Sequence, residues 1–123
     1  MKQDEFMTKV GQRADVSLET AEALTAATLQ TLAERTSGGE AEDLAAQLPA
    51  ELKPHLASTD ENAQGFDAEE FVRRVAERAG MDPERARAGV RAVFTTVREA
   101  VTSGEVDDIT AQLPKDFGEL VGA

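Results

Sequence analysis

The sequence contains no cysteine, tryptophan or tyrosine, and it has a single histidine and five phenylalanines. Without cysteine the chain can form neither a disulfide nor a thiolate metal site, and it has no thiol nucleophile. One histidine is also too few for an ordinary transition-metal centre. The scarcity of aromatic rings disfavours the stacking platforms that bind single-stranded nucleic acid. Carboxylates, arginines and hydroxyl groups are therefore the main chemistry available.

Long apolar runs are absent as well. No run approaches the roughly 18 residues of a membrane span, and the first residues, MKQDEFMTK, lack the apolar region of a signal peptide. The net charge is −11, from 13 basic and 24 acidic residues. Such a charge repels phosphate backbones and anionic membrane surfaces. We therefore expect a soluble, cytoplasmic protein that binds neither nucleic acid nor a membrane.

One segment of the chain occurs twice. SGGEAEDLAAQLPAEL at Ser37–Leu52 reappears as TSGEVDDITAQLPKDF at Thr102–Phe117, 65 residues later and without a gap. The same offset aligns residues 5–52 with residues 70–117, and identical pairs occur along the whole length. Similarity at a fixed spacing indicates an internal duplication.

The duplication predicts the domain organisation. We place the repeats at residues 1–56 and 66–121, joined by a polar linker at residues 57–65. Because either repeat alone is too short to bury a stable core, we expect both to pack together as one domain over residues 1–123. The predicted fold is an all-α, pseudo-two-fold helical bundle, with three main helices and a short closing turn in each repeat.

Helical periodicity and end signals support this fold. Asp67 and Glu70 have capping-box spacing, and Phe66 and Phe71 flank them as a hydrophobic staple. Pro83 suits the first position of the next helix. No segment alternates with the strand period for long, and no hairpin signal occurs. In repeat one the first two helices are predicted over Gln3–Ala14 and Leu18–Arg35, and Pro49 ends the third.

The repeated motif carries two pairs of carboxylates. Glu40 and Asp43 lie one turn apart on a helix face, and Glu105 and Asp108 do the same in repeat two. Oxygen ligands of this kind suit Mg²⁺ or Ca²⁺, so each copy is a candidate metal site. A structural interpretation explains more of the motif. The glutamates fit the third position of a capping box, and each aspartate can pair with the glutamine four residues on.

This motif also carries a resemblance. A leading helix with the pattern EF…V…A, followed by GEAEDLAAQLP at Gly39–Pro49, resembles domain-of-unknown-function family 2267, a group of small prokaryotic helical proteins. The second copy, GEVDDITAQLP at Gly104–Pro114, is a more diverged match. The resemblance implies an all-α fold, and it implies no activity and no catalytic residue.

Repeat two also carries a line of arginines. Arg87, Arg91 and Arg98 fall at i, i+4 and i+11 of one predicted helix, where repeat one has Glu22, Ala26 and Ala33. One interpretation is a solvated helix face with surface ion pairs. The other is a basic strip that meets an acidic partner or a phosphorylated small ligand.

Signals of catalysis are weak. His55 lies between Pro54 and Leu56 with no partner evident from the sequence, and no serine has the surroundings of a nucleophile elbow. We predict no enzyme activity and no cofactor. The predicted function is a non-catalytic protein-interaction or scaffold domain that binds another protein or itself. The alternative is a sensor of a small ligand or divalent ion that uses the acidic motifs or the arginines.

Overall fold

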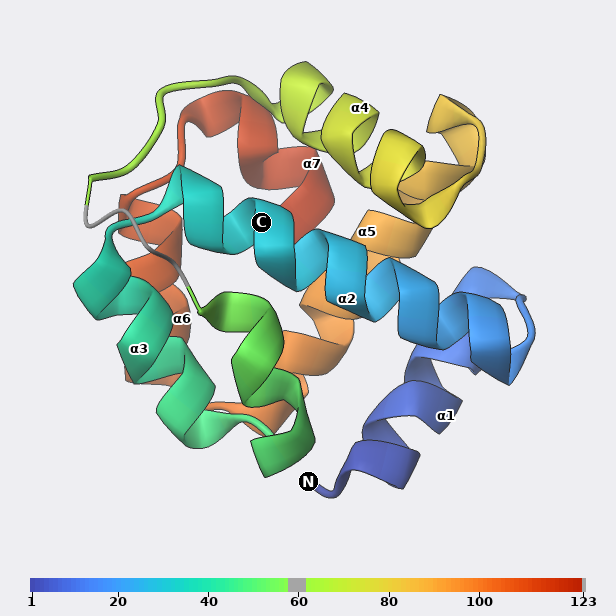
Figure 1. Ribbon diagram of the computed structural model, residues 1–123. Helices are drawn as coiled ribbons and strands as arrows, with labels where there is room; N and C mark the ends of the chain where they lie inside the picture. The colour runs from blue at the N-terminus through green and yellow to red at the C-terminus, as the bar shows by residue number, and fades with distance from the viewer. Residues whose placement is uncertain (58–61, 123) are drawn as a thin grey trace.

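The computed structural model describes residues 1–57 and 62–122, and all regular structure in these residues is helical (Figure 1). The prediction of an all-α bundle is confirmed. Repeat one contains α1 (Gln3–Ala14), α2 (Leu18–Arg35), α3 (Gly38–Gln47) and the 3₁₀ helix η1 (Ala50–Leu56). Repeat two contains α4 (Ala68–Ala79), α5 (Pro83–Ala100), α6 (Ser103–Ala111), the 3₁₀ helix η2 (Lys115–Phe117) and α7 (Gly118–Val121). Of the predicted linker, residues 58–61 lie outside the described residues.

Local sequence explains where these helices begin and end. Each long helix except α1 begins after a side chain that accepts a hydrogen bond from a backbone N–H three residues on, and these caps are Ser17, Ser37, Asp67, Asp82 and Thr102. Gly80 ends α4 in the left-handed conformation, with φ of 69°. Asp15, its counterpart in repeat one, ends α1 with φ of 55°, a conformation that aspartate tolerates better than most residues.

Contacts between the repeats come in matched pairs. In Figure 1, α2 and α5 cross at the centre and α3 lies beside α6. The first helix of each repeat packs against the second helix of the other, so that α1 contacts α5 and α4 contacts α2. This pairing supports the predicted pseudo-two-fold arrangement.

The crossing of α2 and α5 depends on one glycine. A Cβ atom at Gly89 would lie 2.4 Å from Cδ2 of Leu24, which is fully buried. Leu24 and Gly89 are counterparts in the two repeats, 65 residues apart. Repeat one therefore supplies a large side chain at the crossing, and repeat two supplies the space that holds it.

The buried apolar residues of both repeats form one core. Phe6 and its counterpart Phe71 are both fully buried. Phe71 also contacts three other rings, with centroid distances of 6.3 Å to Phe66, 5.8 Å to Phe94 and 5.5 Å to Phe117. The aromatic part of the core is thus concentrated in repeat two.

Polar contacts between the repeats are matched in the same way. Arg13 on α1 forms an ion pair of 2.7 Å with Glu99 and donates to Oγ1 of Thr96 at 2.9 Å, both on α5. The counterpart contacts join α4 to α2, Arg78 to Glu34 at 2.8 Å and Arg78 to Thr31 at 2.8 Å. The arginine hydrogen bonds lower the pKa of Glu99 and of Glu34. None of the helices formed by the described residues is long and apolar enough to cross a lipid bilayer.

Candidate functional site

The two copies of the acidic motif meet where α3 packs against α6, a contact that we call the α3–α6 seam (Figure 1). Each helix begins at a capping hydroxyl. Oγ of Ser37 accepts from the Glu40 N–H at 3.2 Å, and Oγ1 of Thr102 accepts from the Glu105 N–H at 3.3 Å. These caps fix the first turn of each helix, from which both glutamate side chains extend.

Two glutamines cross the seam and cap the opposite helix. Oε1 of Gln112 accepts from the Ser37 N–H at 2.9 Å, and Oε1 of Gln47 accepts from the Thr102 N–H at 2.8 Å. Gln112 Nε2 also lies 3.3 Å from Oγ of Ser37, to which it donates. Since each glutamine lies at the C-terminal end of one helix and reaches the N-terminal end of the other, α3 and α6 run antiparallel.

This arrangement corrects two details of the sequence interpretation. In a complete capping box the glutamate side chain accepts from the N-cap N–H, but a glutamine of the other repeat occupies that donor here. The glutamines were expected to pair with Asp43 and Asp108 along their own helices. They bond across the seam instead, because the antiparallel packing places an unsatisfied N–H within their reach.

The carboxyl groups of Glu40 and Glu105 are left facing each other. Glu105 is 5% exposed, and Oε1 of each glutamate is buried without a hydrogen-bond donor. Burial, a hydrogen bond with Glu40 and the negative charges of Glu40, Asp43 and Asp108 together raise the pKa of Glu105 to about 8, and burial is the largest of these causes. A hydrogen bond between two carboxyl groups requires a proton on one of them, because two carboxylates have no donor.

The structure therefore brings the two copies of the acidic motif to one seam, where the sequence interpretation had two separate pairs. Asp43 and Asp108 are exposed, whereas Glu40 is half-buried and Glu105 is buried. Within residues 1–57 and 62–122, no three acidic or histidine side chains are arranged so that they could hold a metal ion. The geometry of the seam fits a shared proton.

The three arginines of the predicted strip have different surroundings. Nη1 of Arg98 donates to the carbonyl oxygens of Val121 at 3.1 Å and Gly122 at 3.2 Å, so this side chain caps the end of α7. Arg87 is half-buried and Arg91 is exposed. In the described part of the chain neither side chain forms an ion pair. We use the name basic strip for Arg87 and Arg91 alone.

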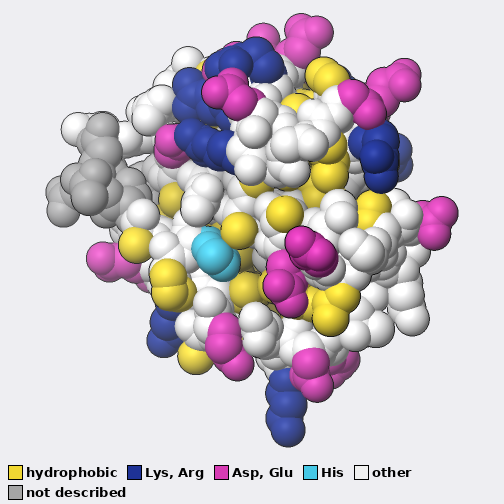
Figure 2. Space-filling model, turned by 45° about the vertical axis from the view of Figure 1, so that its right-hand side comes forward, with side chains coloured by type: hydrophobic (Ala, Val, Ile, Leu, Met, Phe, Trp, Pro, Cys, Tyr) yellow, Lys and Arg dark blue, Asp and Glu magenta, His cyan; other side chains and the backbone are white. Residues whose placement is uncertain are grey.

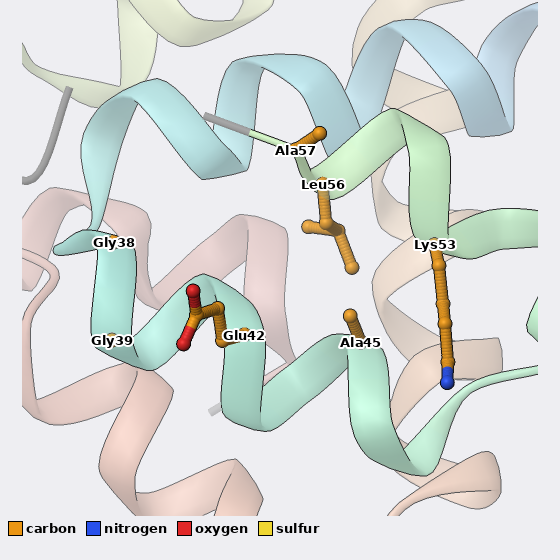
Figure 3. A pocket seen from close by; sticks show the side chains of 7 residues that line it. All are labelled: Gly38, Gly39, Glu42, Ala45, Lys53, Leu56 and Ala57. Carbon is orange, nitrogen blue, oxygen red and sulfur yellow. The ribbon is translucent and has the colours of Figure 1, made fainter. Parts of the chain in front are cut away.

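A hollow of about 600 Å³ lies between α3 and η1 (Figure 3). Glu42 and Lys53 lie on opposite sides of it, and between them Leu56 and Ala45 point toward one another. The backbone of Gly38 and Gly39 forms part of its wall. The two charged groups point away from each other and form no ion pair, so the hollow has no convergent set of polar groups of the kind that fixes a small ligand.

Elsewhere, the residues that the structure describes show no concentration of reactive side chains on the surface. Figure 2 shows one face on which hydrophobic side chains are scattered among charged ones and the only histidine, drawn in cyan, reaches the surface. His55 belongs to η1 and is half-buried. Met1 and Leu18 are the only large hydrophobic residues that are exposed among those described. The described residues thus present neither a nucleophile–base pair nor a large apolar patch.

The comparison with known families agrees with the architecture. The family described as "Uncharacterized conserved protein (DUF2267)" matches residues 3–120, which is nearly the whole chain. The chain belongs to this family. The resemblance seen in the motif is thereby confirmed, and membership in DUF2267 assigns no activity to any residue. No curated protein matches the chain.

Sequence reasoning missed the residues that hold the seam together. It singled out the acidic residues of the motif, whereas the cross-repeat hydrogen bonds come from Gln47 and Gln112. One signal was available: the glutamine is identical in both copies, within AQLP. An uncharged side chain that recurs unchanged in an otherwise divergent repeat indicates a specific contact.

Proposed function

We propose that the chain is a non-catalytic helical domain that binds a protein partner through the basic strip on α5, and that this partner is a second copy of the chain. The observation that carries the proposal is the unpaired state of Arg87 and Arg91. Five other arginines, in contrast, form ion pairs or hydrogen bonds with carboxylates, hydroxyls or carbonyl oxygens. They are Arg13, Arg73, Arg74, Arg78 and Arg98.

The surroundings of the strip suit a close helix–helix contact. Ala88 lies between the two arginines and is exposed, and Thr95 continues the exposed line one turn further along α5. Small side chains there let another helix approach, and the arginines would fix its register. Because opposite charges mainly guide encounter and orientation, such a contact is expected to be reversible and sensitive to salt.

The acidic surface for this partner exists on the same molecule. Glu19 and Glu22 are exposed on α2, and Glu22 is the repeat-one counterpart of Arg87. Ala23 and Ala26 next to them are also small. At the counterparts Glu22 and Arg87, the two repeats thus carry opposite charges. A net charge of −11 makes any copy of the chain an acidic partner for the strip.

Sedimentation velocity with charge reversal tests the proposal. We expect concentration-dependent association at about 50 mM salt that weakens at about 500 mM salt. Arg87→Glu with Arg91→Glu should weaken association about tenfold or more, and so should Glu19→Arg with Glu22→Arg. An equimolar mixture of these two double variants should regain association, because the wild-type halves are complementary and so are the two reversed halves. The quadruple variant should also regain association, because its charges are exchanged.

The control for this series is Arg85→Glu with Glu84→Arg, which alters neighbouring exposed charges of α5 outside the strip. It should leave association unchanged. A wild-type chain that stays monomeric at millimolar concentration and low salt would disprove self-association through the strip.

The sensor alternative keeps one observation in its favour, which is that the two copies of the acidic motif meet at the seam. Isothermal titration with Ca²⁺ and Mg²⁺ tests it directly. Stoichiometric binding that disappears with Asp43→Ala and Asp108→Ala would support a divalent-ion sensor in place of a protein-interaction domain. A cytoplasmic location belongs to the proposal as well, and the acidic, cysteine-free composition supports it.

A further inference from the structure

The α3–α6 seam contains two acidic side chains that repel each other when both are ionised. This feature plays no part in the proposed function. Glu40 and Glu105 meet from opposite helices, and the buried Oε1 atom of each has no donor. The backbone N–H groups of Ser37 and Thr102, which would donate to these glutamates in a complete capping box, donate to Gln112 and Gln47 instead. Two buried carboxylates without donors repel each other, whereas a carboxylic acid beside a carboxylate forms a strong hydrogen bond.

We propose that the α3–α6 seam closes around a single proton shared by Glu40 and Glu105, and that it opens when this proton is lost. The seam is then a pH-sensitive joint between the third helices of the two repeats. The ligand is the proton itself, and the site is distinct from the basic strip on α5.

The charged groups around the pair all oppose ionisation. Asp43 on α3 and Asp108 on α6 act on Glu105 as further negative charges, in addition to Glu40. Neither glutamate of the pair forms an ion pair with any cation of the described residues. Of the cations on neighbouring elements, Arg98 is bonded to the terminal carbonyl oxygens and Lys53 lies on the outer hollow. Gln47 and Gln112 are neutral, so nothing compensates a second negative charge.

The direction of the pH effect follows from this environment. Since the folded-state pKa of Glu105 is raised from 4.5 to about 8, the closed seam is stable at low pH and loses stability as the pH rises through about 8. The seam should therefore be closed at weakly acidic pH and open at alkaline pH. The ion pairs of Arg13 with Glu99 and of Arg78 with Glu34 stay ionised throughout this range and keep the other repeat contacts intact.

The unmodified chain provides the first test. Selective ¹³C labelling of glutamate side-chain carboxyl groups allows each to be titrated by NMR. We expect the Glu105 resonance to titrate near pH 8. Titration of Glu105 near about 4.3 would overturn the proposal.

The second test measures opening directly. Ala46 and Ala111 are exposed counterparts near the ends of α3 and α6, and the chain has no native cysteine to interfere. Spin labels on Ala46→Cys and Ala111→Cys report the separation of the two helices by pulsed electron resonance. Between about pH 6 and about pH 10, we expect the distance distribution to lengthen and broaden.

Two variants test whether the pH response depends on the Glu40–Glu105 pair. Glu105→Gln should keep the seam closed at both pH values, because glutamine donates to Glu40 without ionising. Glu42→Gln, an exposed glutamate of α3, should leave the pH response unchanged. An unchanged distance in the parent chain, or a pH response that persists in Glu105→Gln, would overturn the proposal. Should Glu105→Gln fail to fold, Glu40→Gln takes its place under the same criteria.

Discussion

The second helices of the two repeats, α2 and α5, occupy equivalent positions but bury different side chains in the core. Thr25 and Thr28 face the core from α2, and their counterparts in α5 are Val90 and Val93. The hydroxyl oxygens of both threonines are buried without a hydrogen-bond partner, whereas valine has no polar atom to satisfy. Leu24 and Gly89 differ most of all, because the side chain of one fills the space left by the other.

The contacts between the repeats, in contrast, match closely. Arginine, glutamate and threonine recur at equivalent places in both sets of ion pairs, as Arg13, Glu99 and Thr96 and as Arg78, Glu34 and Thr31. A packed core tolerates changes of shape if neighbouring volumes compensate. A hydrogen bond needs particular atoms at particular places. The comparison teaches that polar contacts between the repeats are constrained more tightly than packing within them.

The largest expected difference between the repeats concerns their equivalent phenylalanines. Phe6→Ala and Phe71→Ala should each lower the free energy of unfolding by about 3–5 kcal/mol, because both rings are fully buried. Phe71→Ala should cost about 1 kcal/mol more, because Phe71 also loses three ring contacts. Urea unfolding followed by circular dichroism measures both. Equal losses would show that the aromatic cluster adds nothing beyond buried area.

The next effect concerns the helix crossing. Gly89→Ala should lower the free energy of unfolding by about 1–3 kcal/mol, because the added methyl group clashes with Leu24. Combining it with Leu24→Ala should cost less than the sum of the two single changes, since the smaller partner makes room. Gly104→Ala, where a Cβ atom meets nothing within 4 Å, is the matched control. Strict additivity would mean that the two positions do not share this space.

The smallest effect should be a gain in stability. Thr25→Val and Thr28→Val copy repeat two into repeat one and remove the buried hydroxyl groups that lack partners. Each should raise the free energy of unfolding by about 1 kcal/mol. Thr31→Val is the contrasting variant, because it removes an acceptor of Arg78 and should destabilise the chain. A loss of stability with Thr25→Val would indicate that this hydroxyl is satisfied after all.

Much of this fold could be predicted from the sequence, because its signals are local. The capping residues Ser17, Asp67 and Asp82 and the stop at Pro49 define helix ends through contacts within a few residues. The 65-residue offset indicates the duplication directly. The site was less predictable. The facing of Glu40 and Glu105 depends on which helix packs against which, and a motif read along one chain does not contain that information.

The contacts of Arg98 illustrate the same limit on prediction from sequence. Its spacing placed it in line with Arg87 and Arg91, as one face of one helix. The end of the chain returns to that face as α7 and supplies carbonyl oxygens that occupy the guanidinium group. Helical periodicity identifies the residues on a common face, but only the tertiary fold determines which of them are covered.

The exchange of glutamines between α3 and α6 has a consequence for how such a protein can arise. In a chain of half this length, the Ser37 N–H would lack its acceptor, and the side chain of Gln47 would lack its donor. Two identical half-length chains could supply these contacts to each other, because the glutamine of each chain would accept from the N-cap N–H of the other. The present molecule has the bonding pattern of such a homodimer after gene fusion, in which neither subunit can any longer dissociate from the other.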